Sequence, residues 1–148
     1  MTEARSRRSL GLLAAFVLSA SVPLRAAADP RIDYMLNCRG CHGPEGRGLP
    51  GAAPSFHGQL GKFLTVPGGR DYLVRVPGTA QSELSDARIA ELLNWMVRAF
   101  DEGNGDDAFA AYTEQEVASY RAWPLTDVEA ARRDLLHAIE QRDTCKSD

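Results

Sequence analysis

Two cysteines and a histidine stand close together in the run Cys-Arg-Gly-Cys-His at positions 38–42. On one helical turn, two thiols three positions apart project from neighbouring faces, where both can reach the vinyl groups of a porphyrin. The imidazole of His42 then lies under the ring, where it can bind iron. Cys-x-x-Cys-His is the attachment signature of c-type haem. We therefore predict that Cys38 and Cys41 bind one haem c covalently and that His42 is the proximal iron ligand.

Two other kinds of site also use paired cysteines. A thioredoxin-like redox pair requires a βαβ setting, and no β-branched run precedes the motif. A zinc site needs further ligands, and the rest of the chain offers only Cys145, His57 and His137, which lack zinc-like spacing. Haem attachment is the favoured interpretation over both.

The first 28 residues have the pattern of a secretory signal peptide. Arginines in the first eight residues precede an apolar run over residues 10–22, which is shorter than the roughly 20 residues needed to span a bilayer. The alanines at 26–28 form a small-residue cleavage site. An uncleaved membrane anchor is the alternative. We predict cleavage after Ala28 and a periplasmic mature chain without stable membrane insertion.

The mature chain would be acidic and of single-domain size. Removing residues 1–28 leaves 120 residues, with 13 basic and 19 acidic side chains and a net charge of −6. This charge argues against binding to nucleic acid or to anionic membranes. Attraction to a basic face of a redox partner and simple solubility explain it equally well. We expect periplasmic redox proteins as partners.

Helical periodicity runs through the whole mature chain. We expect helices over residues 30–41, 57–64 and 70–76, with a glycine- and proline-rich loop over 43–54. The clearest helix follows Ser85, a good N-cap residue. It carries one continuous apolar stripe. The stripe consists of Ile89, Leu92, Leu93, Met96, Val97 and Phe100.

Two capping boxes, at residues 113–116 and 126–129, predict two further helices near the C-terminus. No run of residues has the alternating pattern of a strand. The predicted fold class is therefore all-α. We expect a haem-binding domain over residues 29–103 and a helical extension over residues 104–148, which packs on that domain or serves as a docking element.

Together these features resemble a class I cytochrome c domain. The resemblance implies that the carbonyl of Pro54 accepts a hydrogen bond from His42 and that Phe56 lies against the haem ring. It also implies that Trp95, in the last helix of the domain, packs on the first helix. The residues that carry the resemblance are 38–43, 46–48, 54, 56 and 84–95, within a match over 32–100.

The resemblance implies a single-haem electron carrier and not an enzyme. Such a protein carries one electron between partners such as a periplasmic dehydrogenase and a downstream cytochrome or oxidase. An accessory subunit that transfers electrons only within a complex is a lesser option. In that option the extension would be the docking element.

The chain departs from the family pattern at the second iron ligand. Most class I cytochromes carry a methionine, often followed by proline, in the loop before the last helix, whereas Val76 and Pro77 stand here. Met96 is the best-placed substitute, although a methionine at helical spacing also suits core packing. His57 is the alternative ligand. An open iron is the third option, and it would suit a haem enzyme or a gas-binding or sensor module.

Overall fold

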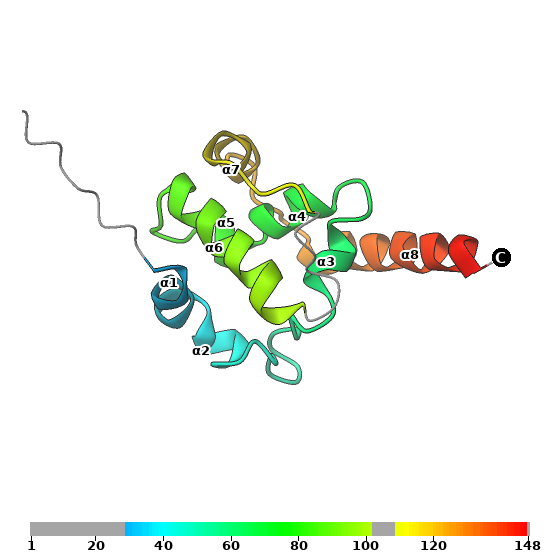
Figure 1. Ribbon diagram of the computed structural model, residues 1–148, viewed down its shortest axis with the longest axis horizontal. Coiled ribbons are helices and arrows are strands. Elements are labelled where there is room, and N and C mark those ends of the chain that lie inside the picture. The colour runs from blue at the N-terminus through cyan, green and yellow to red at the C-terminus, as the bar shows by residue number, and fades with distance from the viewer. Residues whose placement is uncertain (1–28, 102–108, 148) are drawn as a thin grey trace, which may run out of the picture.

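The computed structural model describes residues 29–101 and 109–147, and the regular elements of this part are helices (Figure 1). The all-α fold class is confirmed. The predicted signal peptide lies outside the described residues. No helix in the described part of the chain has the length and apolar character needed to cross a membrane. The helices are α1 (Pro30–Asn37), α2 (Arg39–His42), α3 (Leu60–Phe63), α4 (Gly69–Arg75), α5 (Pro77–Ala80), α6 (Asp86–Phe100), α7 (Glu114–Arg121) and α8 (Val128–Ser147).

The cysteine motif lies across a break between α1 and α2, whereas the sequence predicted one helix over residues 30–41. At Cys38 the backbone leaves the helical region, with φ −120° and ψ −37°. The Cys38 carbonyl then accepts hydrogen bonds from the N–H groups of both Cys41 and His42, at 3.2 and 3.1 Å. Gly43 ends this single turn with a φ of 76°. The motif therefore has a short helical turn of its own.

Helix α6 is the central helix of the fold, and all six residues of its predicted apolar stripe are buried. The Ser85 hydroxyl accepts a hydrogen bond from the Arg88 N–H at 3.3 Å, as the sequence predicted for an N-cap. Helix α1 packs across α6. The Tyr34 ring lies 5.7 Å from the Trp95 ring and 5.1 Å from the Phe100 ring. The expected packing of Trp95 on the first helix is thus confirmed.

Helix α7 packs on α6 and α4. Its predicted N-cap is present, because the Thr113 hydroxyl accepts a hydrogen bond from the Glu116 N–H at 3.2 Å. Near the C-terminal end of α7, the Arg121 guanidinium donates to the carbonyls of Ala80 and Leu84 at 2.8 and 2.7 Å. Helix α7 therefore fixes the connection between α5 and α6.

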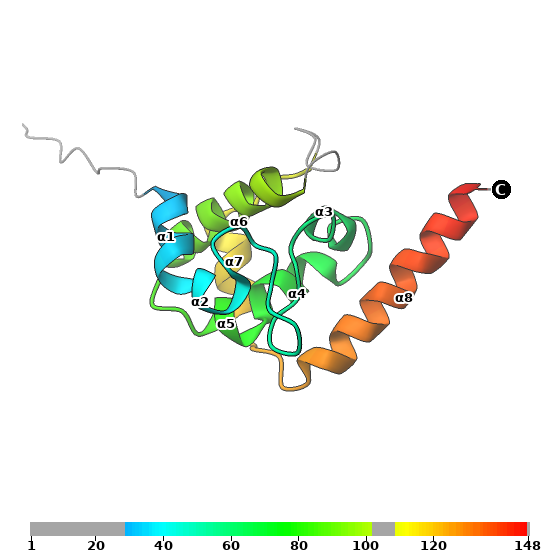
Figure 2. The same cartoon turned by 90° about the horizontal axis from the view of Figure 1, so that it is seen from below.

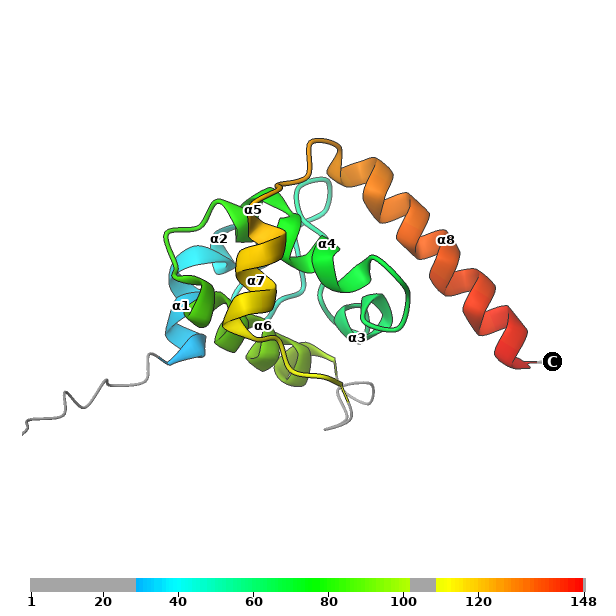
Figure 3. The same cartoon turned by 90° about the horizontal axis from the view of Figure 1, so that it is seen from above.

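Helix α8 begins beside the loop between α2 and α3, and its C-terminal end extends away from the other helices (Figures 2 and 3). Leu135 and Ile139 are its buried side chains, and it packs on α3 and α4. The Asp127 carboxylate accepts a hydrogen bond from the Ala130 N–H at 2.9 Å. The cap is therefore Asp127, where the sequence pattern indicated Thr126, because the helix begins one residue later than that pattern suggests.

Gly69 opens α4 at a point where the backbones of α3 and α4 nearly touch. A Cβ atom at Gly69 would lie 1.8 Å from the carbonyl oxygen of Phe63. We expect Gly69→Ala to lower the free energy of unfolding by about 3 kcal/mol, because the two backbones must separate. Chemical denaturation of the holoprotein measures this loss. Gly40→Ala is the control, since no atom lies within 4 Å of its added Cβ and Gly40 is exposed. Equal stability of the two variants would contradict the prediction.

Candidate functional site

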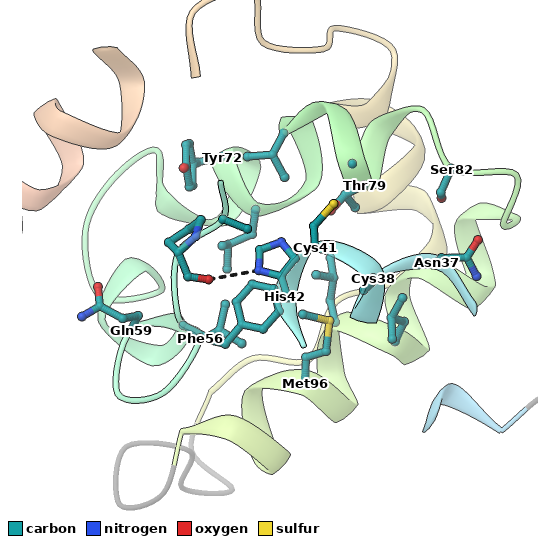
Figure 4. A pocket seen from close by; sticks show the side chains of 18 of the residues that line it. Asn37, Cys38, Cys41, His42, Phe56, Gln59, Tyr72, Thr79, Ser82 and Met96 are labelled. Carbon is teal, nitrogen blue, oxygen red and sulfur yellow. Dashed lines mark hydrogen bonds between the residues drawn. The ribbon is translucent and has the colours of Figure 1, made fainter. Parts of the chain in front are cut away.

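A cavity of about 350 Å³ opens between the motif, α3, α4 and α6 (Figure 4). Cys38, Cys41 and His42 line it together, although α2 supplies no buried residue of its own. The opposite walls are mainly aliphatic. They include Leu60 from α3, Leu73 from α4, and Leu92 and Leu93 from α6. A cavity with these walls excludes water from a bound group and leaves few polar atoms to orient it.

The His42 ring is held by one hydrogen bond and one ring contact. Its Nδ1 lies 3.0 Å from the Pro54 carbonyl oxygen, so the Nδ1–H donates and Nε2 keeps its lone pair for a metal. The Phe56 ring stacks on the imidazole, with ring centres 4.0 Å apart. Burial lowers the pKa of His42, and the Pro54 hydrogen bond opposes this shift. The ring is therefore neutral near pH 7, which is the form that binds iron.

Two glycines shape the loop that presents Pro54. A Cβ on Gly48, whose φ is +75°, would lie 2.4 Å from the Ala53 carbonyl oxygen. The Gly48 N–H donates to the His42 carbonyl at 2.9 Å, and the Phe56 N–H donates to the Gly46 carbonyl at 2.8 Å. The close approach at Gly48 brings both ends of the loop together. The glycines after the motif therefore place the Pro54 carbonyl beside the imidazole.

The two motif cysteines differ in exposure. Cys38 is half-buried and Cys41 is exposed, and both are free thiols. Burial, followed by the charges of Asp33 and Cys41, raises the pKa of the Cys38 thiol to about 11. Cys145 is exposed on α8 and does not line the cavity. The structure thus brings two of the three cysteines to the site.

The predicted candidates for a second iron ligand lie in different surroundings. Met96 is buried and lines the cavity. Figure 4 shows its thioether on the same side of the His42 ring as Phe56, with Tyr72 and Thr79 on the other side. His57 is absent from the cavity lining, and its Nε2 lies 2.6 Å from the Glu45 carbonyl oxygen. The hydrogen bond to Glu45 holds the His57 ring in the loop.

Comparisons with known proteins agree with this geometry. No protein-family model matches the chain. The chain is 32% identical to a cytochrome c-552 of Thermus thermophilus over 132 residues, which cover 77% of this chain and 88% of that protein. This chain belongs to the c-type cytochrome family. A second cytochrome c-552 of Thermus thermophilus is 33% identical over 107 residues, which cover 60% of this cytochrome and 82% of the relative.

Membership of this family makes the cytochrome an electron-transfer protein whose cofactor is covalently bound haem c. The residues at the cavity fit that group, because two free thiols and a neutral imidazole with one open nitrogen meet there. The buried hydroxyl of Ser82, another lining residue, has no hydrogen-bond partner in the described structure.

Sequence reasoning did not predict several of the residues that line the cavity, among them Thr79 and Arg132. Thr79 comes from α5, a single helical turn that was not predicted because Pro77 and Gly78 at its start are typical of a break between helices. Arg132 comes from α8, more than ninety residues after the cysteines. The Pro77 position could have indicated the first of these, since proline favours the first turn of a helix. No local signal connects Arg132 with the motif.

Proposed function

We propose that this cytochrome carries one electron between periplasmic redox proteins on a haem held by Cys38, Cys41 and His42. The observation that carries the proposal is the meeting of these three side chains at one apolar cavity, with the His42 Nδ1 bonded to Pro54. When bound, haem c supplies an iron that alternates between ferric and ferrous states.

The protein's own residues would control that exchange through position and solvent exclusion. The Pro54 carbonyl fixes the imidazole tautomer and raises its basicity, and Phe56 limits rotation of the ring. The leucines of α3, α4 and α6 would keep water from the iron. A change in the charge of the iron would therefore cause little reorganisation of the solvent. No substrate-binding site is needed for this function.

The compartment and the partners belong to the same proposal. The signal-peptide pattern of residues 1–28 supports export to the periplasm. The net charge of −6 in the remaining chain supports docking on a basic face of a partner. A dehydrogenase as donor and a downstream cytochrome or oxidase as acceptor fit this description.

In the electron-carrier proposal, Met96 would be the second protein ligand of the iron. It is the methionine within residues 29–101 and 109–147 that lines the cavity, since Met35 is exposed and is not one of the lining residues. A thioether is a suitable partner for histidine in an electron carrier. His57 is the less favourable alternative, because its Nε2 already lies against the Glu45 carbonyl.

A second candidate function follows from the position of the Met96 side chain. Its thioether lies with Phe56, whereas Tyr72 and Thr79 face the opposite side of the His42 ring (Figure 4). If no side chain served as a second ligand, a small molecule could bind the iron instead. The cytochrome would then be a haem enzyme or a gas-binding module.

Optical spectra of the oxidised and reduced holoprotein, with and without carbon monoxide, separate the two functions. For the electron carrier we expect a low-spin spectrum that carbon monoxide does not change, since both axial positions are filled. Met96→Leu keeps the volume of the side chain and removes the sulfur. This variant should become high-spin and bind carbon monoxide, whereas His57→Asn should not. A high-spin wild-type protein that binds carbon monoxide would establish the second function.

A further inference from the structure

Helix α8 closes one end of the haem cavity. Val128 and Arg132, from its first two turns, line the cavity together with Pro54 and Tyr72. The same two residues also line a shallower hollow outside it, against the loop that contains Ala52. Figures 2 and 3 both show the start of α8 beside this loop. The extension therefore contributes directly to the haem cavity.

Arg132 is a positive charge at this end of the cavity. Arg132 is half-buried, and its guanidinium lies 5.3 Å from the centre of the Phe63 ring. Within the described residues, no hydrogen bond or ion pair joins it to a carboxylate. Arg47, which lines the outer hollow, is already paired with Glu45 at 2.8 Å. Arg132 is thus the arginine of the cavity that is available to an anion.

The chemistry of haem c places its anionic groups at this end. The two thioether bonds form along the vinyl edge of the porphyrin, and the two propionates project from the opposite edge. Cys38 and Cys41 lie on the α1–α2 side, and α8 lies across the cavity from them (Figure 4). A haem attached at the cysteines therefore directs its carboxylates toward α8.

We infer that Arg132 binds a haem propionate and so joins the C-terminal extension to the redox centre. The inference rests on the proposed haem attachment at Cys38 and Cys41. Guanidinium and carboxylate are planar groups that pair through two parallel hydrogen bonds, and partial burial strengthens such a pair. A fixed positive charge beside the haem favours the ferrous state, which carries one positive charge less. Arg132 therefore raises the midpoint potential of this cytochrome.

The test compares Arg132→Gln with Arg133→Gln in the full-length holoprotein. Arg133 is the next residue of α8, is exposed and does not line the cavity. Both variants remove one positive charge from the same helix, so their long-range effects on the potential are similar. We expect Arg132→Gln to lower the ferrous-to-ferric ratio at a fixed applied potential by at least about threefold. This is about 28 mV, at 59 mV for each tenfold change in a one-electron couple. Arg133→Gln should change the ratio much less.

Two further measurements keep the inference separate from the proposed function. Arg132→Lys retains the charge and should recover part of the lost potential, even if the glutamine variant folds poorly. Titration of the midpoint potential against pH should show a higher propionate pKa in Arg132→Gln than in Arg133→Gln, because a carboxylate that loses a cationic partner is easier to protonate. Equal potentials and equal pH profiles in the two glutamine variants would overturn the inference. A wild-type protein without covalent haem would instead refute the haem attachment on which it rests.

Discussion

Replacing both motif cysteines with serine (C38S/C41S) is expected to remove covalently bound haem down to background level. Each thioether forms when a thiol S–H adds across a vinyl group, so that sulfur bonds to one carbon and the hydrogen goes to the other. A serine hydroxyl is a much weaker nucleophile and does not make this addition. Haem that remains after denaturation, measured by in-gel haem staining and by the intact mass of the chain, gives the result directly.

The third cysteine supplies the control for this experiment. Cys145 is exposed on α8 and lies outside the cavity lining. Cys145→Ser should keep the full haem mass and the wild-type spectrum. The single variants C38S and C41S should each retain one thioether at most and bind less haem than the wild type. Covalent haem in the double serine variant, or its loss in Cys145→Ser, would contradict the assignment.

Local patterns in the sequence were sufficient to predict the helices that have strong periodicity or strong caps. The apolar stripe of α6 and the caps at Ser85 and Thr113 are present as expected. The break at Cys38 was not predictable, because nothing in residues 30–41 marks it. The burial of Asp101 was not predictable either: it is 1% exposed, and its carboxylate accepts a hydrogen bond from the Gly61 N–H. Burial of such a group depends on a distant backbone donor, which a local pattern does not contain.

The same distinction applies to the site. Residues adjacent in sequence, such as the motif, can be recognised because one helical turn fixes their spacing. The contact between His42 and Pro54 was predicted only through resemblance to a family. In the structure the His42 Nδ1 lies 3.0 Å from the Pro54 carbonyl oxygen. The place of Met96 relative to the imidazole depends on how α6 crosses the cavity. The position of Arg132 at the cavity depends on the path of the whole extension, which no local pattern contains.

An ion pair that joins α1 to α6 leads to the second large expected effect. The Asp33 side chain is 1% exposed and accepts hydrogen bonds from the Nε and Nη2 atoms of Arg88, whose side chain is 42% exposed. The two partners therefore differ in what their removal leaves behind. Without Arg88, a carboxylate is buried and unpaired. Without the Asp33 charge, the guanidinium can still reach water.

Arg88→Ala is expected to lower the free energy of unfolding by about 3 kcal/mol, because it leaves a buried charge without a partner. Asp33→Asn should cost only about 1 kcal/mol, since it removes the buried charge itself. The double variant should then be more stable than Arg88→Ala alone, and denaturant unfolding of the holoproteins measures all three. Arg98→Ala, at an exposed position of the same helix, is the control and should cost less than about 1 kcal/mol. A larger loss of stability in Asp33→Asn than in Arg88→Ala would contradict this prediction. It would mean that leaving the arginine unpaired costs more than leaving the buried carboxylate unpaired.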